Sequence, residues 1–455
     1  MKPIIIFFAR DYQAELFPKL NSTMYDSVLV TYNKKEKKKI EKNGFKCHEC
    51  FEEIFDILTI KEPPNKYLET SFSSDRYFGK LPIEKRILIL QKYIAFWKYV
   101  YEKYNPLAVI NEVIAVEVSE VMYIEAKKRN IAYLAWLVSP FKERQFYWLS
   151  NPFHASLNRE IFQKEPNQRS IDKIQNYIGK LRNDSSSQPF YVQDLKKRSR
   201  IDIIGKLLFR YLQSILVKTF TKSRSDIFYF DHSKYIKIQI KSFINSLYKN
   251  YDDIKLYRNY ELVFYPLHYE PEASLTYFAE FFDDQINTIK NLTKCLKNRQ
   301  ILIVKEHPQQ PGILLTKQFQ NLRKSYSNIL YLPAEYPTKE LLRVVEFVIT
   351  ISSTAGWEAM MFNKPVFVFG KVFYDKYPLL NICKSFEDLK NKIQNDNFKY
   401  PNFEETLKYA ANFFEYCQEG NPFPHKDLYN IKNIEKILNS IETKIGELLS
   451  ITSCS

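Results

Sequence analysis

TISSTAGWEAMMFNKPVFVFG, residues 350–370, contains two apolar runs separated by a polar turn and by a short apolar segment that carries one glutamate. The turn at 352–354 is Ser-Ser-Thr, and these residue types commonly cap the N-terminus of a helix. Lys364 and Pro365 then end the helix, because proline lacks a backbone N–H and disfavours helical geometry in the residue before it. The stretch therefore predicts a strand, a helix and a second strand, which is the repeating unit of a parallel α/β sheet.

Short apolar runs alternate with helix-like segments on both sides of this stretch, as is typical of parallel sheets. The predicted strands are 3–9, 25–32, 105–111 and 131–137 in the first half, and 261–268, 300–308, 328–333, 347–351 and 365–370 in the second. The predicted helices include 84–104, 116–129, 275–298, 313–325, 338–345 and 355–362. We therefore predict an α/β protein with two Rossmann-like parallel-sheet domains, residues 1–153 and 251–425.

The residues between the two predicted domains, 154–250, are polar and rich in lysine and arginine, so we predict a basic helical insertion there. A C-terminal helix and tail are predicted at 426–455. Within 195–224, apolar residues recur at helical spacing, and basic residues such as Lys206 and Arg210 lie between them. This pattern fits either a helix packed on a domain or a helix that rests on an anionic membrane, and the sequence leaves both open.

The chain is strongly basic, with a formal net charge of +15 over 455 residues. Such a balance indicates an anionic partner, which can be nucleic acid, a phospholipid surface or a phosphate-bearing substrate. A lysine-rich genome is the alternative explanation, because much of the lysine is scattered rather than gathered into one stripe. No nucleic-acid-binding motif accompanies the charge, so nucleic acid is not among the expected partners.

The six cysteines are few and irregularly spaced, which argues against a secreted disulfide framework and favours a reducing compartment. The opening residues lack a signal-peptide cleavage site and reach charged residues early, so we interpret them as a first strand. No uncharged segment approaches the ~20 residues that a spanning helix needs. We therefore expect a cytoplasmic protein, with at most a peripheral contact at the inner face of the membrane.

Several familiar kinds of site are missing from the sequence. Cys47 and Cys50 have CxxC spacing, but no second pair follows, so we interpret them as two surface cysteines and predict no metal site. Walker A, GxGxxG, GxSxG and HExxH patterns do not occur. ATPase, dinucleotide-dependent and common hydrolase activities therefore lose their main support.

The Ser-Ser-Thr turn is a candidate phosphate site, because ligands of open parallel sheets gather beyond the carboxyl ends of strands, where the next helix begins. The predicted phosphate-binding residues there are Ser352, Ser353, Thr354 and Gly356. A plain helix cap is the alternative. Against it, a reciprocal capping glutamate would follow a serine or threonine by three positions, whereas the residue three before Glu358 is an alanine. Glu358 is thereby left for another role.

Two other predicted strands end at the same edge with polar residues. Lys305 and His307 directly follow one strand, and His268 and Glu272 follow another. A single histidine is more often structural than functional. Two histidines at the ends of two strands of one sheet, beside the serine turn, are stronger candidates. We predict that Lys305 belongs to the phosphate site, and that His268 and Glu272 contact the donor or acceptor.

Three motifs carry a resemblance to a known family: FYPLHYEPEAS (264–274), VKEHP (304–308) and TISSTAGWEAMMFNKPVFVFGKVFYD (350–375). In this order and spacing they resemble the capsule polysaccharide biosynthesis family, whose members resemble GT-B glycosyltransferases acting with nucleotide sugars, notably CMP-Kdo. The resemblance covers about the last two fifths of the chain. Asn363 departs from the glycine that is common in GT-B proteins, and a left-handed backbone at this position tolerates the exchange.

The resemblance implies two domains that face each other across a cleft, the second of which binds the nucleotide sugar. It implies that His307 and the serine turn contact the nucleotide phosphate, that His307 stabilises it as it leaves, and that Glu358 lies near the ribose or base. The acceptor would bind mainly to the first domain, where Glu112 is our candidate catalytic base and Glu117 a weaker one. Arg144 would meet a carboxylate or phosphate.

We therefore expect a GT-B-type glycosyltransferase that moves a sugar from a nucleotide donor, most simply CMP-Kdo, onto a capsular or other surface polysaccharide or its lipid-linked primer. It would use no metal and no cofactor, and its partners would include the anionic membrane and capsule assembly proteins. A non-catalytic capsule assembly or export factor and a GT-B-shaped nucleotide-sugar epimerase remain as alternatives. All three would need the same phosphate site.

Overall fold

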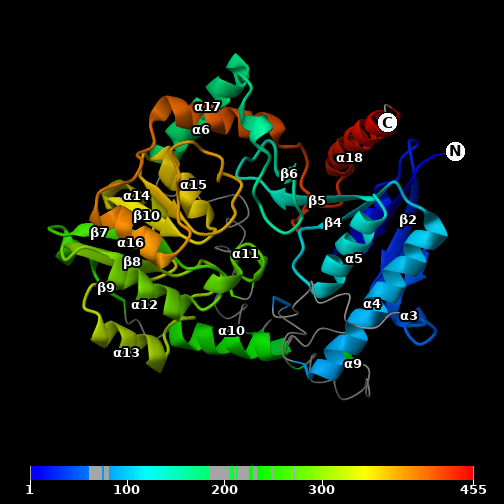
Figure 1. Cartoon of the computed structure of the whole chain (residues 1–455), viewed down its shortest axis with the longest axis horizontal. Coiled ribbons are helices and arrows are strands. Elements are labelled where there is room, and N and C mark those ends of the chain that lie inside the picture. Colours follow the sequence, from blue (N-terminus) through cyan, green and yellow to red (C-terminus); the bar gives the residue numbers. More distant parts are fainter. Residues whose placement is uncertain are drawn as a thin grey trace. The chain divides into compact units, whose positions relative to one another are not determined.

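The computed structural model in Figure 1 divides the chain into two compact units. Unit 1 consists of residues 1–153, 223–230 and 416–455, and unit 2 consists of 154–222 and 231–415. The structure describes residues 2–60, 74–75, 81–183, 205, 208–209, 212, 225–228, 233–246, 251–270 and 272–453. The predicted boundary after residue 153 coincides with a unit boundary, whereas the C-terminal segment that joins unit 1 starts at 416 rather than 426.

Unit 1 contains a six-stranded sheet in the order β3-β2-β1-β4-β5-β6. All neighbouring strands are parallel except β5 and β6, which are antiparallel. The strands are β1 (Ile4–Phe8), β2 (Asp26–Thr31), β3 (Glu49–Cys50), β4 (Ala108–Glu112), β5 (Ala132–Val138) and β6 (Phe146–Trp148). The four strands predicted for this half are confirmed. β3 and β6 are too short to leave an apolar run in the sequence.

Both faces of this sheet are buried. Ile6 and Phe8 of β1 point into one core, and Ile5 and Phe7 point into the other, which is why the strand has no polar alternation. The helices of unit 1 are α1 (Gln13–Leu16), η1 (Phe17–Lys19), α2 (Lys34–Lys42), α3 (Phe51–Ile54), α4 (Ile83–Tyr104), α5 (Glu117–Lys128), α9 (Ser225–Phe228) and α18 (Ile431–Ser453). Helices α4 and α5 lie side by side along the sheet (Figure 1), and α18 contributes isoleucines to the second core.

Unit 2 contains an all-parallel sheet in the order β12-β11-β10-β7-β8-β9. Its strands are β7 (Glu261–Pro266), β8 (Gln300–Lys305), β9 (Ile329–Leu332), β10 (Phe347–Thr350), β11 (Val366–Val368) and β12 (Asn381–Ile382). All five strands predicted for this half are confirmed. β10, the helix α15 (Thr354–Met361) and β11 are the strand, helix and strand predicted from residues 350–370. Asn363 has a φ of 56°, the left-handed backbone expected after this helix.

The remaining helices of unit 2 pack around this sheet. They are η3 (Arg159–Phe162), α6 (Gln168–Asn183), α10 (Ser233–Ser246), η4 (Ile254–Tyr257), α11 (Ala273–Thr276), η5 (Glu280–Phe282), α12 (Gln285–Cys295), α13 (Lys317–Ser325), α14 (Thr338–Val344), α16 (Phe386–Gln394) and α17 (Phe403–Tyr416). The single helix predicted at 275–298 is wrong, because this stretch is broken into α11, η5 and α12. Asp284 starts α12 by accepting a hydrogen bond from the backbone N–H of Asn287 at 3.0 Å.

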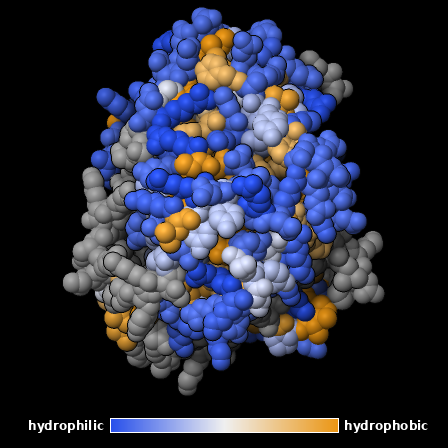
Figure 2. Space-filling view, turned by 90° about the vertical axis from the view of Figure 1, so that its left-hand side faces the viewer, coloured by the Kyte–Doolittle hydropathy of each residue, from blue (hydrophilic) through white to orange (hydrophobic). Residues whose placement is uncertain are grey.

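Of the described parts of the predicted insertion, α9 contributes Ile227 and Phe228 to a core of unit 1, whereas α6 and α10 pack onto unit 2. Arg182 of α6 donates to the carbonyl of Met361 at 2.6 Å, and Ser242 of α10 donates to the carbonyl of Pro311 at 2.5 Å. Most of the basic segment 195–224 lies outside the described residues, so its membrane-contact interpretation stays a prediction. No helix among the described residues has the length and apolarity needed to cross a membrane. On the face shown in Figure 2, hydrophobic residues form separate patches among hydrophilic ones.

Candidate active site

The loops after β7 and β10 of unit 2 meet at the point where the strand order reverses. From β7 the chain continues outward through β8 and β9, whereas β10, β11 and β12 lie on the opposite side of β7. Ligands of open α/β sheets bind at such a point, beyond the carboxyl ends of the strands. His268 follows β7 and Ser352 follows β10, and the backbone N–H of Ser352 donates to Nε2 of His268 at 3.0 Å. Two of the three sequence motifs are thus joined by a direct hydrogen bond.

His268 is a buried acceptor in this arrangement, with 4% of its surface exposed. Burial, and then the neighbouring His307, lower the pKa of His268 to about 3, so the ring is neutral. Since Nε2 accepts from Ser352, the ring proton is on Nδ1. Gln285 of α12 fixes the backbone of His268 on both sides, accepting from its N–H at 2.6 Å and donating to its carbonyl at 3.1 Å. His268 therefore positions the serine turn.

The serine turn makes several hydrogen bonds within the protein. Ser353 is the N-cap of α15, and its Oγ accepts from the N–H of Ala355 at 3.1 Å. The N–H of Ser353 donates to Oγ1 of Thr350 at 3.0 Å, and the Ser352 hydroxyl donates to the carbonyl of Ser274 at 2.9 Å. The amides of 352, 353 and 355 thus already have acceptors. Within the described part of the chain, the Ser353 hydroxyl proton has no acceptor, so it can be donated to a ligand.

Gly356 has a packing role at the start of α15. A Cβ at this position would lie 2.3 Å from the hydroxyl oxygen of Tyr374, and that hydroxyl donates to the carbonyl of Ser353 at 2.6 Å. Only glycine lets Tyr374 approach this closely and fix the carbonyl of the turn. The sequence motif includes Tyr374, but no local pattern indicated that its ring supports the turn.

His307 follows β8, the neighbour of β7. Its Nδ1 accepts from the N–H of Gln309 at 3.2 Å, which leaves the ring proton on Nε2. Burial, and then the charge of Lys305, lower the pKa of His307 to about 4. At neutral pH His307 is therefore an uncharged hydrogen-bond donor at the carboxyl edge of the sheet. This is the residue that the family resemblance assigns to the phosphate.

Lys305, Lys339 and Glu358 form a buried charged cluster at the same edge. The exposed fractions of these residues are 4%, 3% and 9%. Burial raises the pKa of Glu358, and the charges of Lys339 and then Lys305 oppose the rise. Two lysines against one carboxylate give the cluster a net positive charge, which suits an anionic ligand. Lys339 lies on α14 outside the three motifs, and sequence reasoning missed it.

Lys305 also supports the loops, together with the adjacent Glu306. Lys305 donates to the carbonyl of Ala334 at 3.1 Å, and Glu306 accepts from the N–H of Ala334 at 3.3 Å. Glu306 further accepts from the N–H of Gly312 at 2.6 Å, the hydroxyl of Tyr251 at 3.0 Å and the hydroxyl of Tyr331. Burial raises the pKa of Glu306, while these donors favour its ionised form. The carboxylate thereby ties together the loops after β8 and β9.

Glu272 lies at the exposed start of α11 in unit 2. Its Oε2 accepts from the hydroxyl of Ser274 at 2.9 Å, and Ser274 is the residue whose carbonyl accepts from Ser352. Glu272 is therefore connected to the serine turn through one intermediate residue. The structure brings it to the predicted edge, together with both histidines.

The other candidates lie in unit 1, where the strand order reverses between β1 and β4. Glu112 ends β4 and accepts a hydrogen bond from the hydroxyl of Tyr12. Glu117 is fully buried at the start of α5, and its backbone N–H donates to Asp75 at 2.7 Å. Arg144 donates to the carbonyl of Cys417 at 3.0 Å, so it links the loop before β6 to the C-terminal segment. Of these residues, Glu112 lies at the carboxyl edge of the sheet.

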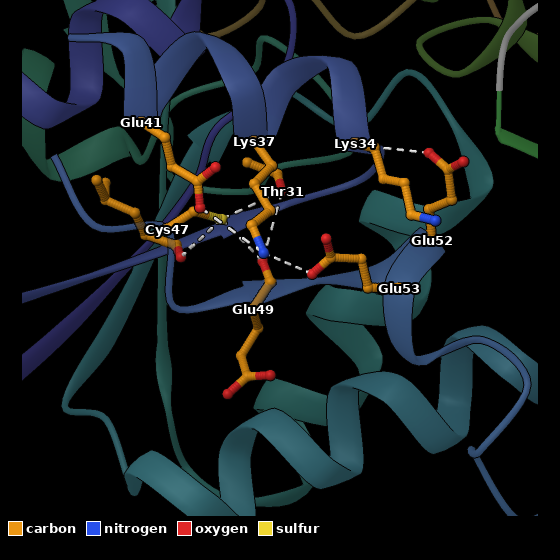
Figure 3. Close-up of polar contacts among 9 residues, drawn as sticks. Thr31, Lys34, Lys37, Glu41, Cys47, Glu49, Glu52 and Glu53 are labelled. Atoms are coloured by element: carbon orange, nitrogen blue, oxygen red, sulfur yellow. Dashed lines mark hydrogen bonds and ion pairs between the residues drawn. The ribbon is translucent and has the colours of Figure 1, made fainter. Parts of the chain in front are cut away.

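The prediction that Cys47 and Cys50 are surface residues is wrong for Cys50, which is 2% exposed on β3. Figure 3 shows Cys47 beside Thr31, at 3.5 Å between Sγ and Oγ1, near the pair formed by Lys37 and Glu53 at 2.7 Å. Pairing of β3 with β2 draws this segment into the sheet. In the ranges that the structure describes, no group of three or more His, Cys, Asp or Glu residues is arranged to hold a metal ion.

Comparison with known proteins finds a family match over part of the chain. Residues 191–382 match the model described as "Capsule polysaccharide biosynthesis protein". A segment of 97 residues is 36% identical to the capsule polysaccharide export protein KpsS of Escherichia coli. This segment is 20% of the chain and spans a quarter, 25%, of that curated relative.

Two solved structures align with most of this chain at low sequence identity. The "beta Kdo 2,4 transferase" KpsC of Thermosulfurimonas dismutans is 16% identical, with a TM-score of 0.40 over 74% of this chain and 87% of the other. The UDP-GlcNAc 2-epimerase of Neisseria meningitidis bound to UDP-GlcNAc is 12% identical, with a TM-score of 0.29 over 98% of this chain and 100% of the other. Neither likeness discriminates between transferase and epimerase. The family match, in contrast, spans all three motifs, and over residues 191–382 this chain is similar to the capsule polysaccharide biosynthesis proteins.

Proposed function

We propose that the protein is a GT-B-type glycosyltransferase that transfers a sugar from a nucleotide donor, most simply CMP-Kdo, to a capsular or other surface polysaccharide or its lipid-linked primer. The observation that carries the proposal is the hydrogen bond between His268 and Ser352. It joins two family motifs at the point of unit 2 where parallel sheets bind ligands. We also propose that the protein is cytoplasmic and contacts the inner face of the membrane peripherally.

Negative charge on the nucleotide phosphate grows as the sugar leaves, and donors already in place stabilise that charge. His307 would donate from Nε2, and Ser353 would donate from its hydroxyl. Lys305 and Lys339 would add the net positive charge of their cluster. These groups support the proposal of a transfer without a metal ion or a cofactor.

Glu112 is the proposed general base for the acceptor hydroxyl. The hydrogen bond from Tyr12 orients its carboxylate at the carboxyl end of β4. Donor and acceptor functions would then be divided between unit 2 and unit 1, as the resemblance implies. Glu272 and Arg144 would contribute to the binding of substrate rather than to the chemical step.

The first test is a thermal-shift screen with CMP, CDP, UDP, GDP and ADP. A ligand that binds only the folded protein stabilises it by about 2.7 kcal/mol at a concentration 100 times its Kd. We expect a selective response to CMP, and a transfer assay with CMP-Kdo in which His307→Ala lowers kcat by about 10²- to 10³-fold. Folded protein that responds to no nucleotide, or a His307→Ala variant with wild-type kcat, would refute the proposal.

A non-catalytic export or assembly factor is the second candidate, and the similarity of one segment to the capsule polysaccharide export protein KpsS favours it. Such a protein would use unit 2 to sense a nucleotide or a glycan. It would bind CMP without consuming CMP-Kdo at any acceptor concentration. Binding with turnover excludes this candidate, and release of a rearranged sugar without an acceptor would indicate an epimerase instead.

A further inference from the structure

Arg10 lies at the carboxyl edge of unit 1, two residues after the end of β1. It stands where the strand order reverses between β1 and β4, which is the ligand-binding position of an open α/β sheet. The Arg10 guanidinium lies over the ring of Phe8, with 5.4 Å from Cζ to the ring centroid. This cation–π contact uses none of the five N–H donors of the guanidinium.

The guanidinium of Arg10 has no hydrogen-bond acceptor in the described part of the chain, and its Nε is buried. Two other described arginines, Arg129 and Arg323, are paired with carboxylates. Arg129 donates to the carboxylate of Glu125 at 2.7 Å, and Arg323 makes two hydrogen bonds to Asp252 at 2.5 and 2.7 Å. The buried Nε–H of Arg10 costs free energy, because this donor has left water without gaining a hydrogen bond in return.

Gln13 stands beside Arg10 and also has an unsatisfied donor. Its Oε1 accepts from the backbone N–H of Arg10 at 3.4 Å. Its Nε2 is buried and has no acceptor within the described ranges, although the residue is only 2% exposed. Two neighbouring side chains at one sheet edge therefore have donors that are withdrawn from water and unpaired. An acceptor supplied by a ligand would satisfy both.

The positive charge of Arg10 acts on residues from several elements. Burial raises the pKa of Tyr12, Tyr32 and Tyr133, and the charge of Arg10 opposes the rise at each. Tyr12 follows β1, Tyr32 follows β2, and Tyr133 lies on β5. The hydroxyl of Tyr12 donates a hydrogen bond to Glu112, the proposed base. Arg10 thus lies close to the proposed base, at the centre of this edge.

We propose that Arg10, supported by Gln13, binds an oxyanion of the acceptor and so positions the acceptor hydroxyl near Glu112. A guanidinium forms paired hydrogen bonds equally well with phosphate and carboxylate, so the oxyanion can be the phosphate of a lipid-linked primer or a carboxylate of an acidic glycan. This assignment rests on the proposed function, in which unit 1 holds the acceptor. The oxyanion site itself rests only on the contacts of unit 1.

The experiment is isothermal titration calorimetry of the full chain with saturating CMP, using sn-glycerol 3-phosphate as a phosphate monoester and D-glucuronate as a sugar carboxylate. We expect Arg10→Gln to weaken binding of the recognised probe at least about tenfold, because a charge-assisted pair of hydrogen bonds is lost. The matched control is Arg129→Gln, which removes a paired arginine of the same unit. A response to the phosphate alone identifies the primer, and a response to the carboxylate alone identifies the glycan.

The site is overturned if the wild-type protein binds neither probe, or if Arg10→Gln binds both like the wild type. If Arg10→Gln also abolishes the thermal shift with CMP, Arg10 serves the donor and the acceptor assignment falls. Binding that depends on Arg10 in a protein without any nucleotide response would leave the oxyanion site standing while the proposed function fails. If Arg10→Gln does not fold, Arg10→Lys keeps the charge without the paired geometry, and it must weaken binding several-fold.

Discussion

The carboxyl edges of the two sheets differ in how many of their loop contacts are made within the protein. In unit 2, His268 accepts from Ser352 and Glu306 accepts from four donors, so the loops are held before any ligand binds, although Nδ1 of His268 is buried without a partner among the described residues. In unit 1, Arg10 and Gln13 carry buried donors without acceptors among the described residues. The first edge is preorganised for charge that develops during a reaction, whereas the second awaits a group that the substrate supplies.

Glu306→Gln should disturb the paired edge most. One carboxylate oxygen of Glu306 accepts from the N–H of Gly312 and the hydroxyl of Tyr331. If the NH₂ group of glutamine took the place of this oxygen, both buried donors would lose their acceptor. We expect a loss of about 3 kcal/mol in the free energy of unfolding. Urea unfolding followed by circular dichroism measures this loss. A variant as stable as the wild type would show that the loops are held by other contacts.

Gly356→Ala should have the next largest effect. The added methyl group would lie 2.3 Å from the Tyr374 hydroxyl oxygen, so the ring or the helix must shift, at about 2 kcal/mol. The double variant with Tyr374→Phe removes the hydroxyl oxygen and should recover part of this loss. Unfolding curves of Gly356→Ala and of the double variant test whether the close approach to Tyr374 causes the loss. If the second substitution recovers nothing, the close approach is not the cause.

Acidification should weaken unit 2 through His268. Its pKa is about 3 in the folded protein and 6.5 in an ordinary environment, so the unfolded chain takes up the proton first as the pH falls. The stability that His268 contributes is complete above about pH 6.5 and is lost toward pH 3. Between pH 7 and pH 5 the loss is about 2 kcal/mol. His268→Gln should remove this part of the pH dependence, and an unchanged slope would contradict the assignment.

Arg10→Gln should have the smallest effect on stability, within about 0.5 kcal/mol of the wild type, since the guanidinium has no hydrogen-bonding partner to lose. The same unfolding measurement, made without ligand, tests this expectation. A loss above about 2 kcal/mol would mean that Arg10 already stabilises unit 1. The contrast between the two sheet edges would then disappear.

The strands were predictable because strands of a parallel sheet are buried on both faces and therefore have continuous apolar sequences, as in β7, β8 and β10. The break before α12 was not predicted, because the capping residue Asp284 was read as part of a continuous helix. The role of His268 was not predictable from its motif. It depends on the adjacency of β7 and β10, which are separated in the chain by two other strands.

Charges were predictable only where a motif contained them. Lys305 ends β8 inside a motif and was recognised, whereas Lys339 lies on α14, outside the motifs, and joins the cluster only through the fold. In the sequence, Arg10 is recognisable only as a charged residue near the start of the chain. Its importance lies in the lack of an acceptor, and a sequence does not show which groups are unpaired.

The C-terminal helix α18 sets an order for synthesis. Its residues Ile437, Ile441 and Ile445 complete the core that begins with Ile5 and Phe7 of β1. A ribosome must therefore make all of unit 2 before the last apolar face of unit 1 can be covered. The core of unit 2 can therefore form while the face of β1 that carries Ile5 and Phe7 still lacks α18.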